Sequence, residues 1–416
     1  MSAYDGPSAD SAPRRTTQVV AYTEAEEVLR SKAFIQGAHA ESGEFMADTL
    51  VMLDGNPHQQ RRRLEAPLFD RAAMAYYDRE ALGPVIEQCI ADCRKQRGAE
   101  GAVKVDLVPL ASMMLHRIAA AVIGIDGIDT PERIERFKWF HDRLAEAMQV
   151  EWAEGDHDAV IARGVEHRAD FVSELFGPSV QRRKDLIARY KAGELSQEDL
   201  PEDLLTLLYL HWDPNWDDNV PLRETSLFML ASIQTTAHAL PHVVYHLSTW
   251  LQEHPEDSER LDDPSFLNLA INESLRLHVP VPSLTRIATA DVELSSGRKF
   301  SAGDVVSVVF GPANRDRSAF GEDADEFQPF RKIPARLRQW GMTFGSGDHT
   351  CLGRPLVTGL ASRGSESGKA IDGSMSRMIH SLFAAGVRLD PEDPPKMVAE
   401  TKHDAYASMP VLLTAL

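Results

Sequence analysis

Cysteine is scarce in this chain, whose 416 residues include three: Cys89, Cys93 and Cys351. Such a small and odd number excludes a disulfide-stabilised secreted domain and agrees with a reducing compartment. Long apolar runs are also missing, since no stretch approaches the roughly 20 residues that cross a bilayer. The first residues have neither the apolar stretch of a secretory signal nor the acid-poor bias of a transit peptide. We therefore expect a soluble cytoplasmic protein without a membrane anchor.

Positive charge is in deficit as well: 44 Lys and Arg stand against 63 Asp and Glu, which gives a formal net charge of −19. Binding to phosphate backbones depends on clustered Lys and Arg, so this composition argues against nucleic acid as a partner. The remaining composition, 43% hydrophobic and 26% charged, is typical of a globular protein.

Hydrophobic periodicity predicts a mainly helical protein with small β-sheets, an α+β fold. Residues 222–254 form a pattern typical of one central helix that is apolar on all sides in its middle, and Pro241 should kink it. Amphipathic helices are predicted over 23–34, 81–95, 110–125, 131–148 and 266–278. Strands are predicted within 289–300, with a turn at Ser296-Gly297, and over 304–310.

The N-terminal end and one internal segment are predicted to be flexible. We expect residues 1–17 to form a flexible tail and residues 18–416 to form a single domain. The segment 361–376 is rich in glycine and serine, which predicts a mobile surface loop.

The stretch FGSGDHTCLG, residues 344–353, places Cys351 in a glycine-rich loop. A thiolate that binds iron needs a tight loop with backbone N–H groups directed at the sulfur, and glycines permit the required backbone angles. A buried structural cysteine is the alternative for a lone intracellular thiol. A zinc site through His349 and Cys351 is a poorer interpretation, because no further Cys or His pair has a clear ligand spacing.

The loop resembles the haem loop of the cytochrome P-450 haem-thiolate monooxygenases, Phe-x-x-Gly-x-x-x-Cys-x-Gly. Phe344, Gly347, Cys351 and Gly353 match that pattern. The resemblance implies the cytochrome P-450 fold, with haem b between a long central distal helix and a proximal cysteine loop and helix. It also implies Cys351 as the axial iron ligand, with Gly345 beside it in the cofactor-binding loop.

Further residues in the right order support the resemblance, which covers about residues 18 to 395. Glu273 and Arg276 match the Glu-x-x-Arg pair of the family on one helix face, and Arg331 is our candidate for the arginine that joins this pair in a structural role. The two haem propionates require charge-assisted hydrogen bonds. The residues that resemble the usual propionate partners are His58, Arg62, Arg286 and His349.

The stretch ASIQTT, residues 231–236, resembles the oxygen-activating part of the central helix, where an acid followed by Thr relays protons. Thr235 and Thr236 fit, but Gln234 replaces the acid. An amide cannot titrate as a carboxylate does, so we expect proton delivery to differ. The alternatives are a water chain through Thr235, a proton supplied by a group of the substrate, or a reaction without this relay. For His238 and His242, a position on a solvent or packing face is preferred over a role in proton transfer.

Two departures from the family concern chain length. The segment before the first matched helix is shorter by roughly 30 residues, so an initial strand and the first helix are expected to be missing or replaced. An insertion of roughly a dozen residues is expected after Cys351, within or behind the proximal helix.

The expected substrate pocket is mostly apolar, which favours a terpenoid, steroid, polyketide or aromatic substrate. Its predicted lining comprises parts of a lid at 34–53 together with Leu230, Ile233, Val279, Val281, Pro282 and Leu284. The resemblance implies a bacterial-type monooxygenase of secondary metabolism that uses O2 and two electrons from a ferredoxin-type donor with its reductase. A basic docking patch is predicted from Arg61, Arg63, Arg336, Arg338, Arg354 and Arg363.

Two other functions remain open at this point. Gln234 raises the alternative of a haem-thiolate enzyme for oxidative coupling, isomerisation or peroxide-driven oxidation. A haem sensor or ligand carrier without turnover is the other, and Thr235 and Thr236 argue against it.

Overall fold

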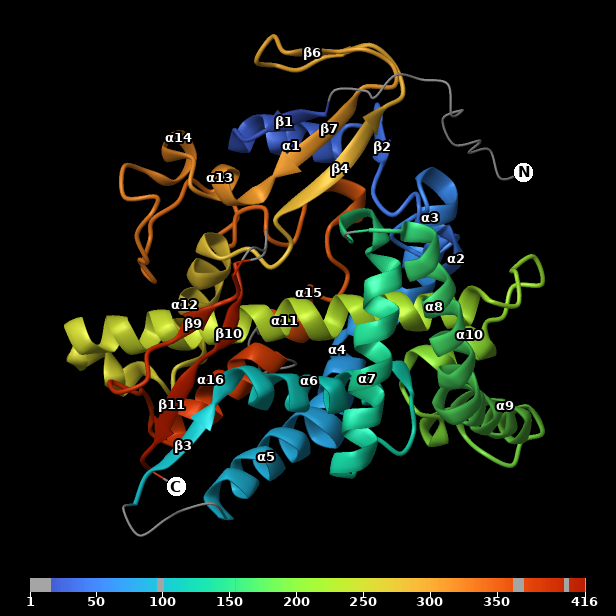
Figure 1. Cartoon of the computed structure of the whole chain (residues 1–416), viewed down its shortest axis with the longest axis horizontal. Helices are drawn as coiled ribbons and strands as arrows, with labels where there is room; N and C mark the ends of the chain where they lie inside the picture. Colours follow the sequence, from blue (N-terminus) through green and yellow to red (C-terminus); the bar gives the residue numbers. More distant parts are fainter. Residues whose placement is uncertain (1–15, 96–100, 154, 362–369, 400–403, 416) are drawn as a thin grey trace.

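The computed structural model describes residues 16–95, 101–153, 155–361, 370–399 and 404–415. Helix α11 (Val220–Glu253) crosses the whole molecule, with a sheet above it and helices α5 and α6 below it in the view of Figure 1. Its middle is buried on several sides, at Met229, Ile233, Leu240 and Val243. The apolar sequence predicted burial on all sides of this middle part, but Ala231 is exposed there.

The five amphipathic segments are all helical, with bounds that differ by a few residues from the predicted ones. They are α1 (Tyr22–Arg30), α5 (Gly83–Lys95), α6 (Leu107–Ile123), α7 (Pro131–Met148) and α12 (Pro264–Leu277). The Asp106 carboxylate accepts from the N–H of Val108 at the start of α6, and Gly124 ends that helix at a positive φ of 97°.

The described chain contains further α-helices. They are α2 (Gly43–Met46), α3 (Gly55–Glu65), α4 (Arg71–Tyr77), α8 (His157–Phe171), α9 (Gly177–Lys191), α10 (Leu204–Leu210), α13 (Phe310–Asn314), α14 (Arg317–Phe320), α15 (Arg354–Thr358) and α16 (Ser374–Ala384).

The largest sheet has four strands in the order β1 (Thr17–Val19), β7 (Val305–Val309), β4 (Ser283–Ala288) and β2 (Phe34–Gln36). Strand β1 is parallel to β7, and the other neighbours are antiparallel. A three-stranded sheet joins β3 (Val103–Asp106), β11 (Pro410–Leu413) and β8 (Val387–Leu389). Two hairpins pair β5 (Val292–Glu293) with β6 (Lys299–Phe300) and β9 (Lys396–Met397) with β10 (Tyr406–Ser408). The turn between β5 and β6 has Gly297 at a φ of 85°, in the predicted place.

The N-terminal expectation needs correction. Helix α1 is the helix predicted over 23–34, and strand β1 precedes it, so a strand is present before the first matched helix. Thr17 pairs with Val306, so the last residue of the expected tail belongs to the sheet. Residues 1–15 lie outside the described part of the chain.

The segment after the cysteine loop also departs from expectation. Helix α15 ends at Thr358, and the last three residues of the predicted loop, 374–376, are buried in the first turn of α16. Leu360 and Ile371 exchange backbone hydrogen bonds, and a Cβ on Gly373 would lie 2.2 Å from the Val357 carbonyl oxygen. Leu360 and Ile371 therefore lie side by side before α16 begins, and residues 362–369, most of the expected insertion, lie outside the described residues.

Helix α11 continues through Pro241 to Glu253, so the proline does not end the helix. None of the helices in the described ranges combines the length and the apolar character that a membrane crossing requires.

Candidate active site around Cys351

The cysteine loop is closed by hydrogen bonds within its own backbone. The N–H of Cys351 donates to the Phe344 carbonyl at 2.8 Å, and the N–H of Gly345 donates to the Met342 carbonyl at 2.7 Å. Gly347 has a φ of 72°, and a Cβ there would lie 2.3 Å from the Leu29 carbonyl oxygen, so only glycine lets the loop lie against α1.

The Cys351 thiol lies deep in the fold and is nevertheless solvent-accessible, so it opens onto an internal space. Burial raises the pKa of the thiol. The backbone N–H groups of Gly353 and Arg354, together with the positive charges of Arg62 and Arg354, act in the opposite direction. This is the set of interactions that stabilises a ligating thiolate, and a bound cation would add to it.

Behind the loop, Glu273 and Arg276 form a fully buried ion pair. Arg276 also donates to the Asn314 and Ala324 carbonyls, each at 2.7 Å. Arg331 donates from Nε to the Glu273 carboxylate at 2.8 Å, so the structure joins the three residues that the sequence placed together. They connect α12 to the segment 313–331 that leads into the cysteine loop.

The four predicted propionate partners come from three parts of the chain. His58 and Arg62 lie one turn apart on α3, and the His58 ring is 4.2 Å from the His349 ring of the cysteine loop. Arg286 lies on β4, where it is buried and donates to the Gln36 side chain. Burial and the nearby positive charges of His349 and Arg62 lower the pKa of His58 to about 4.

Asp54 is a member of this group that the sequence analysis missed. Its carboxylate contacts His349 Nε2 at 3.2 Å and accepts from the N–H of Gln36 at 3.2 Å. Although burial raises the pKa of Asp54, these hydrogen bonds hold it below the ordinary value. Its position directly before α3 was the available signal, since an acid before a helix is a common cap, but here the side chain orients His349 instead.

The face of α11 around residue 231 is exposed. Ala231 is exposed in the middle of this central helix, between the buried Met229 and Ile233. Thr235 lies one turn further on the same face, and its hydroxyl donates to the Ala231 carbonyl at 2.6 Å. Thr236 is buried.

Gln234 has a partner that the sequence did not predict. Gln149, directly after α7, donates from Nε2 to Gln234 Oε1 at 3.2 Å. The two residues are 85 positions apart, so no local pattern could have related them.

The residues predicted for the substrate pocket have different surroundings. Ile233 and Val279 are buried members of the hydrophobic core, whereas Leu230, Val281, Pro282 and Leu284 are partly exposed. In the predicted lid, Phe45 and Met46 are fully buried.

The predicted basic patch is wrong at one residue. Arg61 is buried and forms an ion pair with Glu224 of α11, because it faces inward on α3. Arg338 and Arg354 flank the Trp340 ring at 5.7 and 5.0 Å, and Arg63 and Arg336 are exposed. Arg363 lies outside the described residues.

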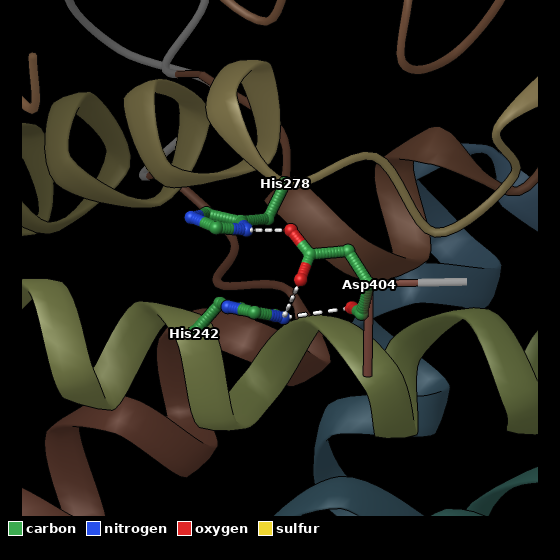
Figure 2. A group of neighbouring side chains, drawn as sticks. All are labelled: His242, His278 and Asp404. Atoms are coloured by element: carbon green, nitrogen blue, oxygen red, sulfur yellow. Dashed lines mark hydrogen bonds and ion pairs between the residues drawn. The ribbon is translucent and has the colours of Figure 1, made fainter. Parts of the chain in front are cut away.

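A second cluster of side chains with metal-binding groups consists of His242, His278 and Asp404 (Figure 2). The two imidazoles are stacked, with ring centroids 3.9 Å apart and planes 12° apart, so their in-plane lone pairs do not converge on one ion as ligands must. Instead, His242 Nε2 contacts the Asp404 carbonyl oxygen at 2.8 Å and His278 contacts the Asp404 carboxylate. The cluster fastens the segment before β10 to α11 and α12, and His242 packs there as the sequence analysis preferred.

The side chains around Cys351 fit a haem. The bare face of α11 at Ala231 and the accessible thiol provide surfaces for the two sides of a flat group, and Gly353 keeps side-chain bulk away beside the sulfur. His58 is 2% exposed, and its Nε2 has no hydrogen-bond partner within the described ranges. The Arg62 guanidinium likewise has no hydrogen bond or ion pair to those residues. Two such donors suit the carboxylates of a haem.

Comparisons with known proteins agree with this assignment. The cytochrome P450 family matches residues 251–358. The steroid C26-monooxygenase of Mycobacterium tuberculosis (strain CDC 1551 / Oshkosh) is 26% identical over 312 residues, which cover 74% of this chain and 73% of that protein. Cytochrome P450 monooxygenase 205 of Postia placenta is 24% identical, over 75% of this chain and 68% of its own length.

Solved structures support the fold. The crystal structure of CYP109E1 from Bacillus megaterium in complex with testosterone superposes with a TM-score of 0.69 at 20% identity, over 97% of this chain and 96% of that one. Together, the thiolate loop, the buried Glu273–Arg276–Arg331 group, the family match and the shared fold lead to one assignment. The chain belongs to the cytochrome P450 family of haem-thiolate monooxygenases.

Proposed function

We propose that this protein inserts one oxygen atom from O2 into a hydrophobic small molecule, in the cytoplasm, with electrons from a ferredoxin-type donor and its reductase. The observation that carries the proposal is the accessible Cys351 thiol together with the bare face of α11 at Ala231 and Thr235. Haem b, when bound, supplies the activation of O2. Cys351 holds its iron, and His58, Arg62, Arg286 and His349 hold its propionates.

A steroid-sized substrate is the first choice for a screen. The partly exposed Leu230, Val281, Pro282 and Leu284 give the pocket an apolar lining. One related protein is a steroid C26-monooxygenase, and a solved structure of similar fold contains testosterone. Terpenoids, polyketides and small aromatics complete the panel.

The electron donor is proposed to bind a basic surface formed by Arg338 and Arg354 around Trp340. Arg63 and Arg336 are further exposed cations. An acidic ferredoxin would be steered to such a patch. Arg338→Glu should slow reduction at low salt by about tenfold and weaken its salt dependence. Arg189→Glu on α9, an exposed arginine outside this surface, is the control.

The test is a titration of the haem-loaded protein with the substrate panel, followed through the Soret band. A saturable shift to the high-spin form, followed by NADH-dependent product, would support the proposal. Cys351→Ser should abolish thiolate ligation, whereas Cys93→Ser should retain it, because Cys93 lies in α5. Normal ligation in the Cys351→Ser variant would contradict the proposal.

Atypical chemistry is the second candidate, and Gln234 favours it. Its amide oxygen accepts a hydrogen bond from Gln149, and an amide does not exchange protons as a carboxylate does. Oxidative coupling, isomerisation or a peroxide-driven reaction needs no such relay. Product formed with hydrogen peroxide but not with NADH and a ferredoxin would favour this candidate.

A further inference from the structure

The side chain of Gln149 joins helices α7 and α11. It follows the last residue of α7, and its Nε2 lies 3.4 Å from the Ala145 carbonyl oxygen and 3.2 Å from Gln234 Oε1. Both Gln149 and Gln234 are half-buried. The contact therefore lies partly away from water, where its orientation has energetic weight.

The Ala145 carbonyl determines which way the two amides face. A backbone carbonyl only accepts hydrogen bonds, so the group of Gln149 next to it must be the NH2 group. The same NH2 group faces Gln234, so Gln234 must present its oxygen to Gln149. The NH2 group of Gln234 is thereby left for another acceptor, and it makes no hydrogen bond to the residues that the structure describes.

We infer that Gln149 is a positioning residue that holds Gln234 as a hydrogen-bond donor toward the bound substrate, and that the substrate carries an acceptor such as a carbonyl oxygen. This inference rests on the proposed function, because it concerns the same pocket. A carboxylate at position 234 would repel such an oxygen, whereas a fixed NH2 group attracts it. The replacement of the usual acid by Gln234 then serves substrate recognition.

The predicted lid also contacts the end of α7. His39 Nδ1 donates to the Met148 carbonyl at 3.0 Å, and the His39 ring packs edge to face on Trp152 at 5.4 Å. His39, in the lid, and Gln234, on α11, are thus attached to neighbouring residues, Met148 and Gln149.

The test uses two imidazole probes of nearly equal shape on the haem-loaded protein. They are 1-(4-acetylphenyl)imidazole, which carries an acceptor, and 1-(4-isopropylphenyl)imidazole, which does not, and their dissociation constants are read from the Soret band. The acetyl probe should bind the unaltered protein about fivefold more tightly, as one hydrogen bond allows. Gln234→Leu should reduce this ratio to about one.

Gln149→Glu is the decisive variant, because it leaves position 234 unchanged. A carboxylate cannot donate, so Gln234 must turn its NH2 group to Glu and its oxygen to the pocket, and the preference should reverse in favour of the isopropyl probe. Gln149→Leu should leave an intermediate ratio, since the amide is then free to rotate.

Three results would overturn the inference: no preference in the unaltered protein, a preference that survives Gln234→Leu, or a preference that Gln149→Glu leaves unchanged while Gln234→Leu removes it. Failure of the proposed function gives a different result. If imidazole itself does not change the Soret band of the unaltered protein, the iron is not accessible, and the proposed function falls together with this inference.

Discussion

Arg276 donates two hydrogen bonds to the Glu273 carboxylate, at 2.9 Å from Nε and 2.7 Å from Nη2, and neither side chain is exposed to solvent. Arg331 adds a third bond to the same carboxylate. Two guanidinium groups therefore share one buried anion, and Arg331 also pairs with the exposed Asp323. Removal of one partner from a buried ion pair lowers the free energy of unfolding by far more than the intact pair raises it. The reason is that the remaining charge stays buried without its counter-charge.

Glu273→Ala should lower the free energy of unfolding by about 3–5 kcal/mol. Urea denaturation followed by circular dichroism measures this loss. Glu322→Ala is the matched control, because Glu322 also pairs with an arginine, Arg317, but is exposed, and its removal should cost less than about 1 kcal/mol. Equal losses in the two variants would contradict the role of the buried group.

Haem removal should leave His58 uncharged at neutral pH. Burial, together with the positive charges of His349 and Arg62, lowers the pKa of His58 to about 4, and a propionate at its free Nε2 would raise it. An NMR titration of the apoprotein should show this low midpoint, and Arg62→Gln should raise it. A midpoint at the ordinary value in the apoprotein would refute the arrangement.

Local spacing made much of the site predictable. His58 and Arg62 are four residues apart and Glu273 and Arg276 three apart, so each pair had to share one helix face once the segment was helical. The loop from Phe344 to Gly353 is similarly short, and its glycines fix its conformation. The central helix could be predicted because its apolar length has no breaker except Pro241.

Long-range partners could not be predicted in this way. Arg61 looks like an exposed neighbour of Arg62 and Arg63, yet it is buried because Glu224, 163 residues away, provides its counter-charge. Gln149 and Asp54 likewise gain their roles from residues that are distant in sequence, Gln234 and His349. Helical periodicity shows which face a residue occupies but not what the fold places against it.

Gln234→Glu should fold normally, because Gln149 can donate to a carboxylate as it does to the amide oxygen. The new carboxylate can exchange protons, so NADH-dependent product formation should rise by about tenfold if proton delivery limits the reaction of the unaltered protein. It should fall instead if the Gln234 NH2 group binds the substrate acceptor, because a carboxylate repels that oxygen. The measurement compares product formed with hydrogen peroxide released. A loss of product with more hydrogen peroxide would mean that the amide itself is required.

Stability should fall as the pH rises from about 4.5 to neutrality and above, because of two buried carboxyl groups. Arg61 forms an ion pair with Glu224, which also accepts from the N–H of Leu50 at 2.9 Å. The Glu65 carboxylate has no hydrogen-bond partner among the described residues, and Arg61 and Arg62 are its nearby positive charges. Burial raises the pKa of Glu224 to about 7. Burial and the charge of Glu224 raise that of Glu65 well above its ordinary value.

The folded protein therefore binds more protons than the unfolded chain between about pH 4.5 and pH 7 and above, so its stability decreases as the pH rises through this window. Urea midpoints at pH 5, 6, 7 and 8 should decline for the unaltered protein. Glu65→Gln keeps the shape without the charge and should decline less, whereas Glu322→Gln, an exposed control, should follow the unaltered protein. If the difference between the Glu65→Gln variant and the unaltered protein is the same at all four pH values, Glu65 does not hold a proton in the folded state.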